Sequence, residues 1–262
     1  MGYWETVKRV IEEADIIFEV LDARFPERSR NAKLESLVKG KGKKLAFIIN
    51  KADLCGKRAV EKKARELSRE APCIFISAKM RQGTNALRKA VGELAGGRHV
   101  RIAFCGYPNV GKSSIINRLA RKKSAGTSPR AGFTKGMQKI RASKGVMLVD
   151  TPGVIPLEEG DECIMAMLGT KNPEQLKDLE GTGLDVAEAL LENNREAINE
   201  HYKLGPDFNG DAEALLEKIA FSRNRLLKGA RPDLNAAAKI LINDLQKSEI
   251  RIGRKPVEVA EK

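Results

Sequence analysis

One stretch, residues 98–118, constrains the fold of this chain more than any other. An apolar run at residues 100–105 ends at Gly106, Gly-Lys-Ser follows at residues 111–113, and a helical pattern begins there. Gly-x-x-x-x-Gly-Lys-Ser between a strand and a helix is typical of the phosphate-binding P-loop. The stretch therefore predicts an α/β fold with an anion site, and the alternative is a glycine-rich turn that fits the pattern by chance.

The residue types in this loop suit a nucleotide phosphate. Gly106 and Gly111 lack Cβ, so backbone N–H groups can curl around an anion, and the N-terminus of the following helix adds positive potential. We expect Lys112 to reach the β- and γ-phosphates and the Ser113 hydroxyl to bind Mg²⁺. The nucleotide-binding residues of this segment are predicted to be Asn109, Val110, Gly111, Lys112, Ser113 and Ser114.

A second polar sequence, Asn50-Lys51-Ala52-Asp53, follows an apolar run at residues 44–49. Ligands bind at the carboxyl ends of strands in α/β sheets. The Asp53 carboxylate can accept hydrogen bonds from N1–H and the 2-amino group of guanine, and adenine lacks that amino group. Lys51 would lie over the base, and Asn50 would tie the loop to its neighbours. Asn, Lys and Asp are also common in loops, so Asn50-Lys51-Ala52-Asp53 would be weak evidence for guanine binding if the P-loop were absent.

Another strand-like run, residues 73–76, ends in Ser77-Ala78-Lys79. A backbone N–H at Ala78 could donate to guanine O6, which would add Ser77, Ala78 and Lys79 to the nucleotide site. The alternative is an ordinary turn at the end of a strand.

Two segments after the P-loop offer contacts to Mg²⁺ and the γ-phosphate. Thr134, about twenty residues beyond the loop, can close over the nucleotide and complete the Mg²⁺ shell. A predicted hairpin over residues 137–149 delivers Asp150, which is placed to hold Mg²⁺, and then Gly153, whose N–H can sense the γ-phosphate. The predicted metal residues are therefore Ser113, Thr134 and Asp150.

Together these segments resemble the motifs of translation-factor-type GTPases, but the base-reading segments precede the phosphate-binding ones. That order resembles the circularly permuted GTPases, the YlqF/RbgA and Nog2-like ribosome-assembly family. The sequence Asp22-Ala23-Arg24-Phe25-Pro26, with Ser29-Arg30-Asn31, is similar to that family's N-terminal signature. The resemblance covers residues 4–160 by specific motifs, and residues 223–229 more weakly resemble its C-terminal segment.

The resemblance implies an enzyme that hydrolyses GTP with Mg²⁺ and serves in assembly of the large ribosomal subunit. Its partners would be that subunit or its precursor, and rRNA. The predicted catalytic residues are Lys112, Thr134 and Gly153. Asn109 lies where similar GTPases hold K⁺ in place of an arginine finger, and the alternative is that it only shapes the loop. A rival function is a nucleotide-gated RNA-binding module with incidental hydrolysis; an ATPase is disfavoured by Asn50–Asp53.

Two features of the sequence bear on the rate. Bacterial members of the family carry a catalytic histidine near the N-terminus, but His99 and His201 are the only histidines here and neither matches it. The matching position would precede Met1, so the chain resembles the archaeal and eukaryotic branch more, or is shortened. As elsewhere in the family, the residue after Gly153 is Val154, which cannot orient water as the glutamine of ordinary GTPases does. Slow intrinsic hydrolysis is expected.

The charge is uneven along the chain. The net charge is +13; residues 1–170 hold 33 basic and 18 acidic residues, whereas residues 171–262 hold 15 and 17. This excess favours a polyanionic partner, nucleic acid more than membrane, and the alternative is a generally basic solvated surface.

Four widely spaced cysteines and no long apolar segment predict a reduced, soluble, cytoplasmic protein, which we expect to be a monomer that does not bind membranes.

We expect a permuted GTPase domain over residues 1–170 and an all-α C-terminal domain with a polar tail over residues 171–262. The C-terminal pattern predicts helices over residues 174–180, 184–200, 211–227 and 233–247, and no strand. Two basic clusters there would contact rRNA phosphates: Arg223, Arg225, Lys228 and Arg231, and Lys247, Arg251, Arg254 and Lys255. The alternative is that these residues form solvated helix ends.

Overall fold

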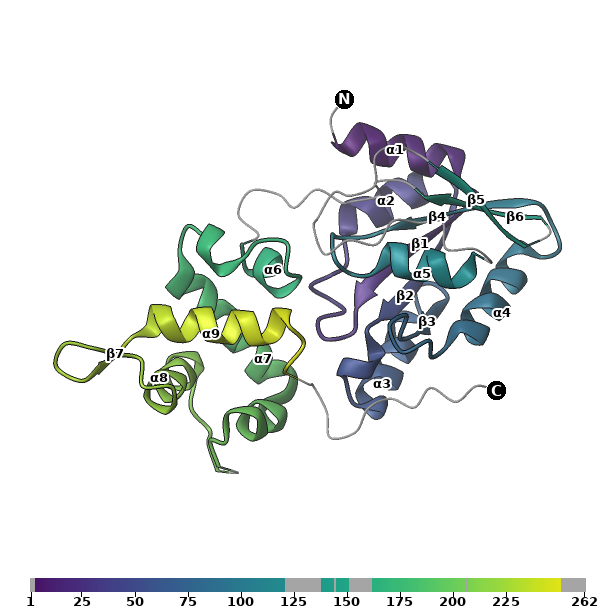
Figure 1. Cartoon of the computed structure of the whole chain (residues 1–262). Helices are drawn as coiled ribbons and strands as arrows, with labels where there is room; N and C mark the ends of the chain where they lie inside the picture. Colours follow the sequence, from purple (N-terminus) through teal and green to yellow (C-terminus); the bar gives the residue numbers. More distant parts are fainter. Residues whose placement is uncertain (1–2, 121–137, 144, 151–161, 206, 251–262) are drawn as a thin grey trace. The chain divides into compact units, whose positions relative to one another are not determined.

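The computed structural model describes residues 3–120, 138–143, 145–150, 162–205 and 207–250. These residues form two compact units, one containing the described residues up to 150 and the other containing residues 162–250 (Figure 1). In the described part, no helix is long and apolar enough to cross a membrane.

A mixed sheet forms the centre of the first unit. Its six described strands lie in the order β3-β2-β1-β4-β6-β5, and all are parallel except β5, which runs antiparallel to β6 (Figure 1). The strands are β1 Ile16–Asp22, β2 Lys44–Asn50, β3 Cys73–Phe75, β4 Val100–Cys105, β5 Gln138–Ser143 and β6 Val146–Asp150.

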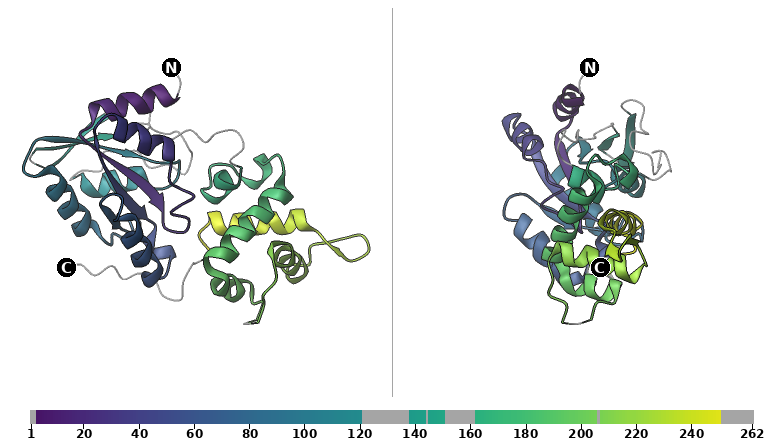
Figure 2. Two further views of the ribbon diagram at one scale, coloured as in Figure 1. Left: turned by 180° about the vertical axis from the view of Figure 1, so that it is seen from behind. Right: turned by 90° about the vertical axis from the view of Figure 1, so that its left-hand side faces the viewer.

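Helices cover both faces of this sheet (Figure 2). The first two helices pack together against it, and the helices before and after β4 form another pair. The helices are α1 Tyr3–Glu13, α2 Ala32–Gly40, α3 Lys57–Leu67, α4 Thr84–Ala95 and α5 Lys112–Leu119, with a 3-10 turn η1 at Ala52–Leu54. Because both faces are covered, the parallel strands read as continuous apolar runs in the sequence.

The core of the unit lies along β1, β2 and β4. All seven residues of β1 are buried. The rings of Phe18 and Phe104 stack with centroids 5.6 Å apart, which joins the two central strands. Glu19, Asp22 and Asn50 are the buried polar residues of these three strands, and two of them end a strand.

The register of the strands gathers the predicted motifs at one edge. Asp22 at the end of β1 pairs with Asn50 at the end of β2, and Glu19 pairs with Cys105 at the end of β4. The segments after β2, β3 and β4 therefore leave the sheet at the same edge, with β1 between β2 and β4. The predicted α/β P-loop fold is confirmed, and the segments predicted to read the base follow strands that precede the P-loop in the chain.

The second unit is a helical bundle. The long helix α7 packs on α8 and α9, which also contact each other. Aspartates at positions 178, 211 and 233 cap these helices, each accepting a backbone N–H at 2.9 Å. The elements are α6 Glu162–Met167, a 3-10 turn η2 Pro173–Gln175, α7 Leu179–Tyr202, α8 Ala212–Ser222 and α9 Leu234–Gln246.

Three details of the second unit differ from the sequence analysis. Helix α6 packs on α7 and α9, so this unit includes residues that were assigned to the first domain. Residues 174–180 form a 3-10 turn and the start of α7 instead of a separate helix. The predicted helix over 211–227 ends at Ser222, because Asn224 adopts a left-handed conformation with φ 51°.

A short hairpin stands where no strand was expected. Strand β7, Leu226–Leu227, pairs antiparallel with β8, Arg231–Pro232. Gly229 and Ala230 have φ values of 80° and 56°, and these left-handed residues reverse the chain. The expectation of an all-α domain is therefore correct for its core but omits this hairpin.

Candidate nucleotide-binding site

The predicted P-loop connects β4 to α5. Val110 is buried, and Asn109 adopts a left-handed conformation with φ 62°. Ser113 and Ser114 lie half-buried in the first turn of α5. The loop therefore has the strand-to-helix setting that phosphate binding requires.

Both glycines of this loop are required by close packing against residues of β1 and β2. A Cβ on Gly106, whose φ is 148°, would lie 2.6 Å from the carbonyl oxygen of Val20. Gly111 has a φ of 100°, and a Cβ there would overlap the side-chain amide of Asn50. Larger residues would force the loop away from β1 and β2, so the glycines shape the concave backbone predicted to hold phosphates.

Lys112 lies against the same loop. Its Nζ donates to the carbonyl oxygens of Gly106 and Tyr107 at 2.8 and 2.7 Å. The ammonium group is thus held beside the loop, where we predict the β- and γ-phosphates to bind.

Asn50 joins the phosphate and base segments. Its side chain is buried; Nδ2 donates to the carbonyl oxygen of Val110 at 2.8 Å, and Oδ1 accepts from the N–H of Ala78 at 3.1 Å. One amide therefore links the end of β2, the P-loop and the segment after β3, as its predicted tying role requires. The Ala78 N–H already has this partner, so donation to guanine O6 requires that the hydrogen bond be shared or exchanged.

Asp53 is held in the half-buried 3-10 turn η1. Ser77 donates its hydroxyl to Asp53 Oδ1 at 2.5 Å and accepts the N–H of Met80 at 3.0 Å. The hydroxyl orients the carboxylate that is predicted to read guanine. Lys79 is exposed beside this turn.

A helix also supports the base segment. Arg118 of α5 donates Nε to the carbonyl oxygen of Ala78 at 2.9 Å. The helix that begins at the P-loop is thereby bonded to the turn that is predicted to read the base.

A buried ionic cluster borders the base segment, and two of its members, Asp22 and Arg24, were predicted only as part of a family signature. Lys51 Nζ lies 2.8 Å from Asp22 Oδ2, and the Arg24 guanidinium binds both oxygens of the same carboxylate. The sequence does hold a signal for Asp22: like Asn50, it is a polar residue that ends a buried strand. Ligands of α/β sheets bind at the carboxyl ends of strands, so this pattern indicates that both residues lie at the ligand edge of the sheet.

The proposed Mg²⁺ site is only partly described. Thr134 and Gly153 lie outside the described residues, and of Asp150 the structure gives the backbone position at the end of β6, next to β4. A hydroxyl at Ser113 and a carboxylate at Asp150 are oxygen ligands of the kind that Mg²⁺ prefers. Ser113 lies half-buried in the first turn of α5, directly after the loop predicted to hold phosphates, and this position fits a metal bound through nucleotide phosphates.

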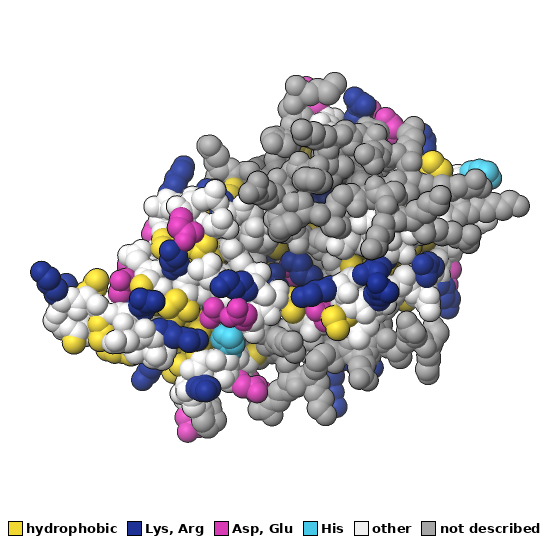
Figure 3. Space-filling model, in the orientation of Figure 1, with side chains coloured by type: hydrophobic (Ala, Val, Ile, Leu, Met, Phe, Trp, Pro, Cys, Tyr) yellow, Lys and Arg dark blue, Asp and Glu magenta, His cyan; other side chains and the backbone are white. Residues whose placement is uncertain are grey.

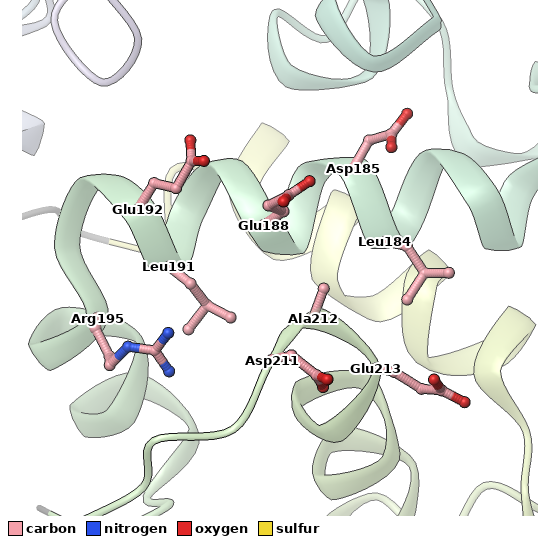
Figure 4. Close-up of a pocket in the computed structure, with 9 residues that line it drawn as sticks. All are labelled: Leu184, Asp185, Glu188, Leu191, Glu192, Arg195, Asp211, Ala212 and Glu213. Carbon is pink, nitrogen blue, oxygen red and sulfur yellow. The ribbon is translucent and has the colours of Figure 1, made fainter.

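A groove in the second unit does not suit a nucleotide. It lies between α7 and the start of α8, and Figure 4 shows the side chains around it. Five of them are carboxylates, and the one arginine, Arg195, donates to the carbonyl oxygen of Gly210. Phosphate groups would be repelled there, so within the described residues the P-loop edge is the better nucleotide site.

Comparison with known proteins finds GTP-binding relatives. Residues 101–203 match the family model described as 50S ribosome-binding GTPase. An uncharacterized GTP-binding protein of Methanocaldococcus jannaschii is 38% identical over 247 residues, which cover 93% of this chain and 65% of that protein. The nuclear/nucleolar GTPase 2 of Arabidopsis thaliana is 32% identical, over 94% of this chain and 43% of that protein. The chain thus spans only part of the length of these relatives.

Solved structures show the same fold. Thermotoga maritima YlqF in its GNP-bound form has a TM-score of 0.63 to this chain at 21% identity, covering 95% of this chain and 94% of that one. The GDP-bound form of the same protein gives the same score and identity over 98% and 99%. Residues 101–203 thus carry a GTPase domain of the matched kind, and the chain, with its P-loop sheet, has the fold of YlqF.

Proposed function

We propose that this protein binds and slowly hydrolyses GTP and acts as a switch in assembly of the large ribosomal subunit. The observation that carries the nucleotide part is the Asn50 side chain, which bonds both the P-loop and the turn after β3. These bonds support a site in which Asp53, the carboxylate proposed to select guanine, lies at the same sheet edge as the P-loop. The ribosomal part is supported by the family description of residues 101–203.

In the proposed reaction, water attacks the γ-phosphorus in line with the leaving GDP oxygen. Lys112 and the backbone N–H groups of the P-loop would stabilise the charge that develops on the phosphate oxygens. Ser113 and Asp150 would hold Mg²⁺, with Thr134 completing the set, and the metal supplies further positive charge to the β- and γ-phosphates. Gly153 would donate its N–H to the γ-phosphate.

Base selectivity tests the nucleotide assignment. Labelled GTP should be displaced by GDP and not by an equal concentration of ATP, because adenine lacks the 2-amino group that Asp53 would bind. Displacement by ATP at the same concentration would instead indicate an ATPase.

The hairpin end of the second unit is the proposed rRNA contact. Arg223, Arg225, Lys228 and Arg231 are exposed there, together with Leu226 and Leu227, which are 39% and 49% exposed. Figure 3 shows basic and hydrophobic side chains together at this end of the face in view. We name Arg223, Arg225, Lys228 and Arg231 the hairpin cluster. Guanidinium and ammonium groups suit phosphates, and the leucines offer apolar contact to exposed bases.

Neutralising the hairpin cluster with glutamine should weaken binding to large ribosomal subunits. Each lost phosphate contact means that fewer counterions are released when the protein binds RNA. The magnitude of the slope of log affinity against log salt concentration should therefore fall by ~3. The measurement is co-sedimentation with subunits over a range of salt concentrations. GTP hydrolysis by the free protein should stay unchanged.

A matched control replaces four exposed basic residues of α3, namely Lys57, Arg58, Lys62 and Arg65. This variant loses the same charge from the other unit and should bind subunits nearly as the wild type does. If the α3 variant loses binding and the hairpin variant keeps it, docking belongs to the first unit.

The isolated protein should turn over GTP slowly, at about 10⁻³ per second or less. Val154 cannot orient water, and hydrolysis should rise when bound subunits order the nucleotide site and exclude bulk water.

If Asn109 holds K⁺, replacing K⁺ by Na⁺ should lower the stimulated rate, and Asn109→Ala should remove that difference. Single-turnover hydrolysis in both salts, with and without subunits, checks this; a fast rate that is indifferent to both would contradict it.

The proposed location is the cytoplasm and the proposed state is a monomer. The name of the Arabidopsis relative assigns that protein to the nucleus and nucleolus, so the location is to be tested in the source organism's own cells. Fractionation followed by sedimentation of the cytoplasmic pool would measure both the location and the oligomeric state.

A further inference from the structure

The strand end next to the base segment carries a side chain that the proposed reaction does not use. Asp22 ends β1 directly beside Asn50 of β2, and the N–H of Ala23 donates to the carbonyl oxygen of Asn50 at 2.8 Å. The Asp22 side chain is fully buried. Its backbone is therefore fixed to the first residue of the Asn50–Asp53 segment.

The Asp22 carboxylate accepts four hydrogen bonds from two residues. Oδ1 accepts from the backbone N–H and the Nε of Arg24, each at 3.0 Å. Oδ2 accepts from Arg24 Nη2 and from Lys51 Nζ, each at 2.8 Å. A carboxylate offers about four acceptor sites, so this one is fully engaged in a fixed geometry.

The charges of the cluster explain why this carboxylate is ionised. Burial alone favours a higher pKa for Asp22, but the charges of Arg24 and Lys51 outweigh burial and hold the pKa of this carboxyl well below its usual range. Burial lowers the pKa of Lys51, and the Asp22 carboxylate acts in the opposite direction. Asp22 therefore remains an anion that attracts the Lys51 ammonium.

The backbone of Lys51 also limits where its side chain can lie. Lys51 has a φ of 63°, a left-handed conformation that is uncommon for a residue with a Cβ. Its side chain is 23% exposed, so part of it faces solvent at the ligand edge while the ammonium reaches inward to Asp22. A lysine with a constrained backbone and an ammonium group held at Asp22 presents its methylene groups in a fixed place.

We propose that Asp22 is a positioning residue for the guanine base, holding the Lys51 ammonium so that the lysine stem is preformed as a platform for the face of the ring. Arg24 keeps the carboxylate charged and buried. The inference rests on the proposed function, because it requires guanine to lie against the Asn50–Asp53 segment. The position of Asp22 at the end of β1, beside Asn50 of β2, explains how the Asp22-Ala23-Arg24 sequence can serve the nucleotide site.

Asp22→Asn tests this with a matched pair of nucleotides. The change keeps the size of the side chain and removes the charge that holds Lys51. The Kd values for GDP and inosine diphosphate should rise by the same factor, about tenfold, since Lys51 contacts the ring face that both bases share. Asp53→Asn should instead weaken GDP more, because inosine lacks the 2-amino group.

A double-mutant cycle separates positioning from a general structural effect. In a Lys51→Ala background, Asp22→Asn should have no further effect on either Kd. Because Asp22→Asn removes the carboxylate that pairs with Arg24, the variant Asp22→Asn with Arg24→Gln removes both charges and should give the same loss of affinity. Asp15→Asn is the matched control. Asp15 directly precedes β1, and the change breaks its ion pair with Arg101 of β4; both Kd values should stay unchanged.

The outcomes distinguish this inference from the proposed function. If wild type binds GDP tightly and the charge-neutralised double variant binds it equally well, Asp22 does not position Lys51. The inference would also be overturned if Asp22→Asn lowered nucleotide affinity by the same factor in the wild-type and Lys51→Ala backgrounds, since the effect of Asp22 would then not depend on Lys51. If wild type fails to bind GDP, the proposed function fails, and the inference fails with it.

Discussion

Lys112→Ala is expected to abolish GTP hydrolysis, with a loss of about a thousandfold or more in the single-turnover rate. The Lys112 ammonium lies beside the P-loop, bonded to the carbonyl oxygens of Gly106 and Tyr107. A fixed charge at this place stabilises the phosphate oxygens most in the transition state, and removing such a donor costs on the order of 10²–10³ in rate or more. Rapid mixing of enzyme with radiolabelled GTP measures the effect.

Two companion variants sharpen this prediction. Ser113→Ala should also abolish hydrolysis and remove the Mg²⁺ dependence of tight GTP binding, because its hydroxyl is the predicted metal ligand. Lys89→Ala removes an exposed lysine of α4 and should hydrolyse GTP at the wild-type rate. A Lys112→Ala protein as active as the Lys89→Ala protein would rule out the P-loop as the phosphate site.

Asp53→Asn should weaken GTP binding by about 2–4 kcal/mol, or roughly thirty- to a thousandfold. The change replaces a charged acceptor of two hydrogen bonds by an amide that presents one acceptor and one donor. Ser77, which donates to the Asp53 oxygen at 2.5 Å, can still bind the amide oxygen, so the turn should keep its shape. Calorimetric titration with GTP and GDP measures the loss.

The same variant should relax the choice of base. Xanthine carries a carbonyl where guanine has the 2-amino group, so the amide of Asp53→Asn can donate to it. The variant should therefore bind xanthosine diphosphate better than wild type does. Unchanged affinity for GTP would remove Asp53 from the site.

Much of the fold follows from local sequence. The apolar runs of β1, β2 and β4 are visible because strands covered on both faces lack polar alternation. The P-loop is visible because its glycines and its Gly-Lys-Ser are local requirements of one turn. The position of Asn50 in the site follows from the rule that ligands bind at strand ends, and its bonds to Val110 and Ala78 agree with that expectation.

Other features depend on contacts between distant segments. That Asp22 holds Lys51 follows from the β1–β2 register, which local pattern does not specify. The hairpin at Leu226–Leu227 has helix-forming residues, and only the left-handed backbone around it ends the helix. Helix α6 belongs to the second unit because of its packing on α7 and α9, which no signal in its own short sequence indicates.

The most direct test of the account is co-sedimentation of the protein with large ribosomal subunits in the presence of a non-hydrolysable GTP analogue, of GDP, or of no nucleotide. A GTP-dependent switch predicts tight association with the analogue and at least tenfold weaker association with GDP, and faster GTP hydrolysis in the bound state. Equal binding in all three conditions, with hydrolysis unaffected by subunits, would contradict the account and indicate an RNA-binding module whose nucleotide site does not govern docking.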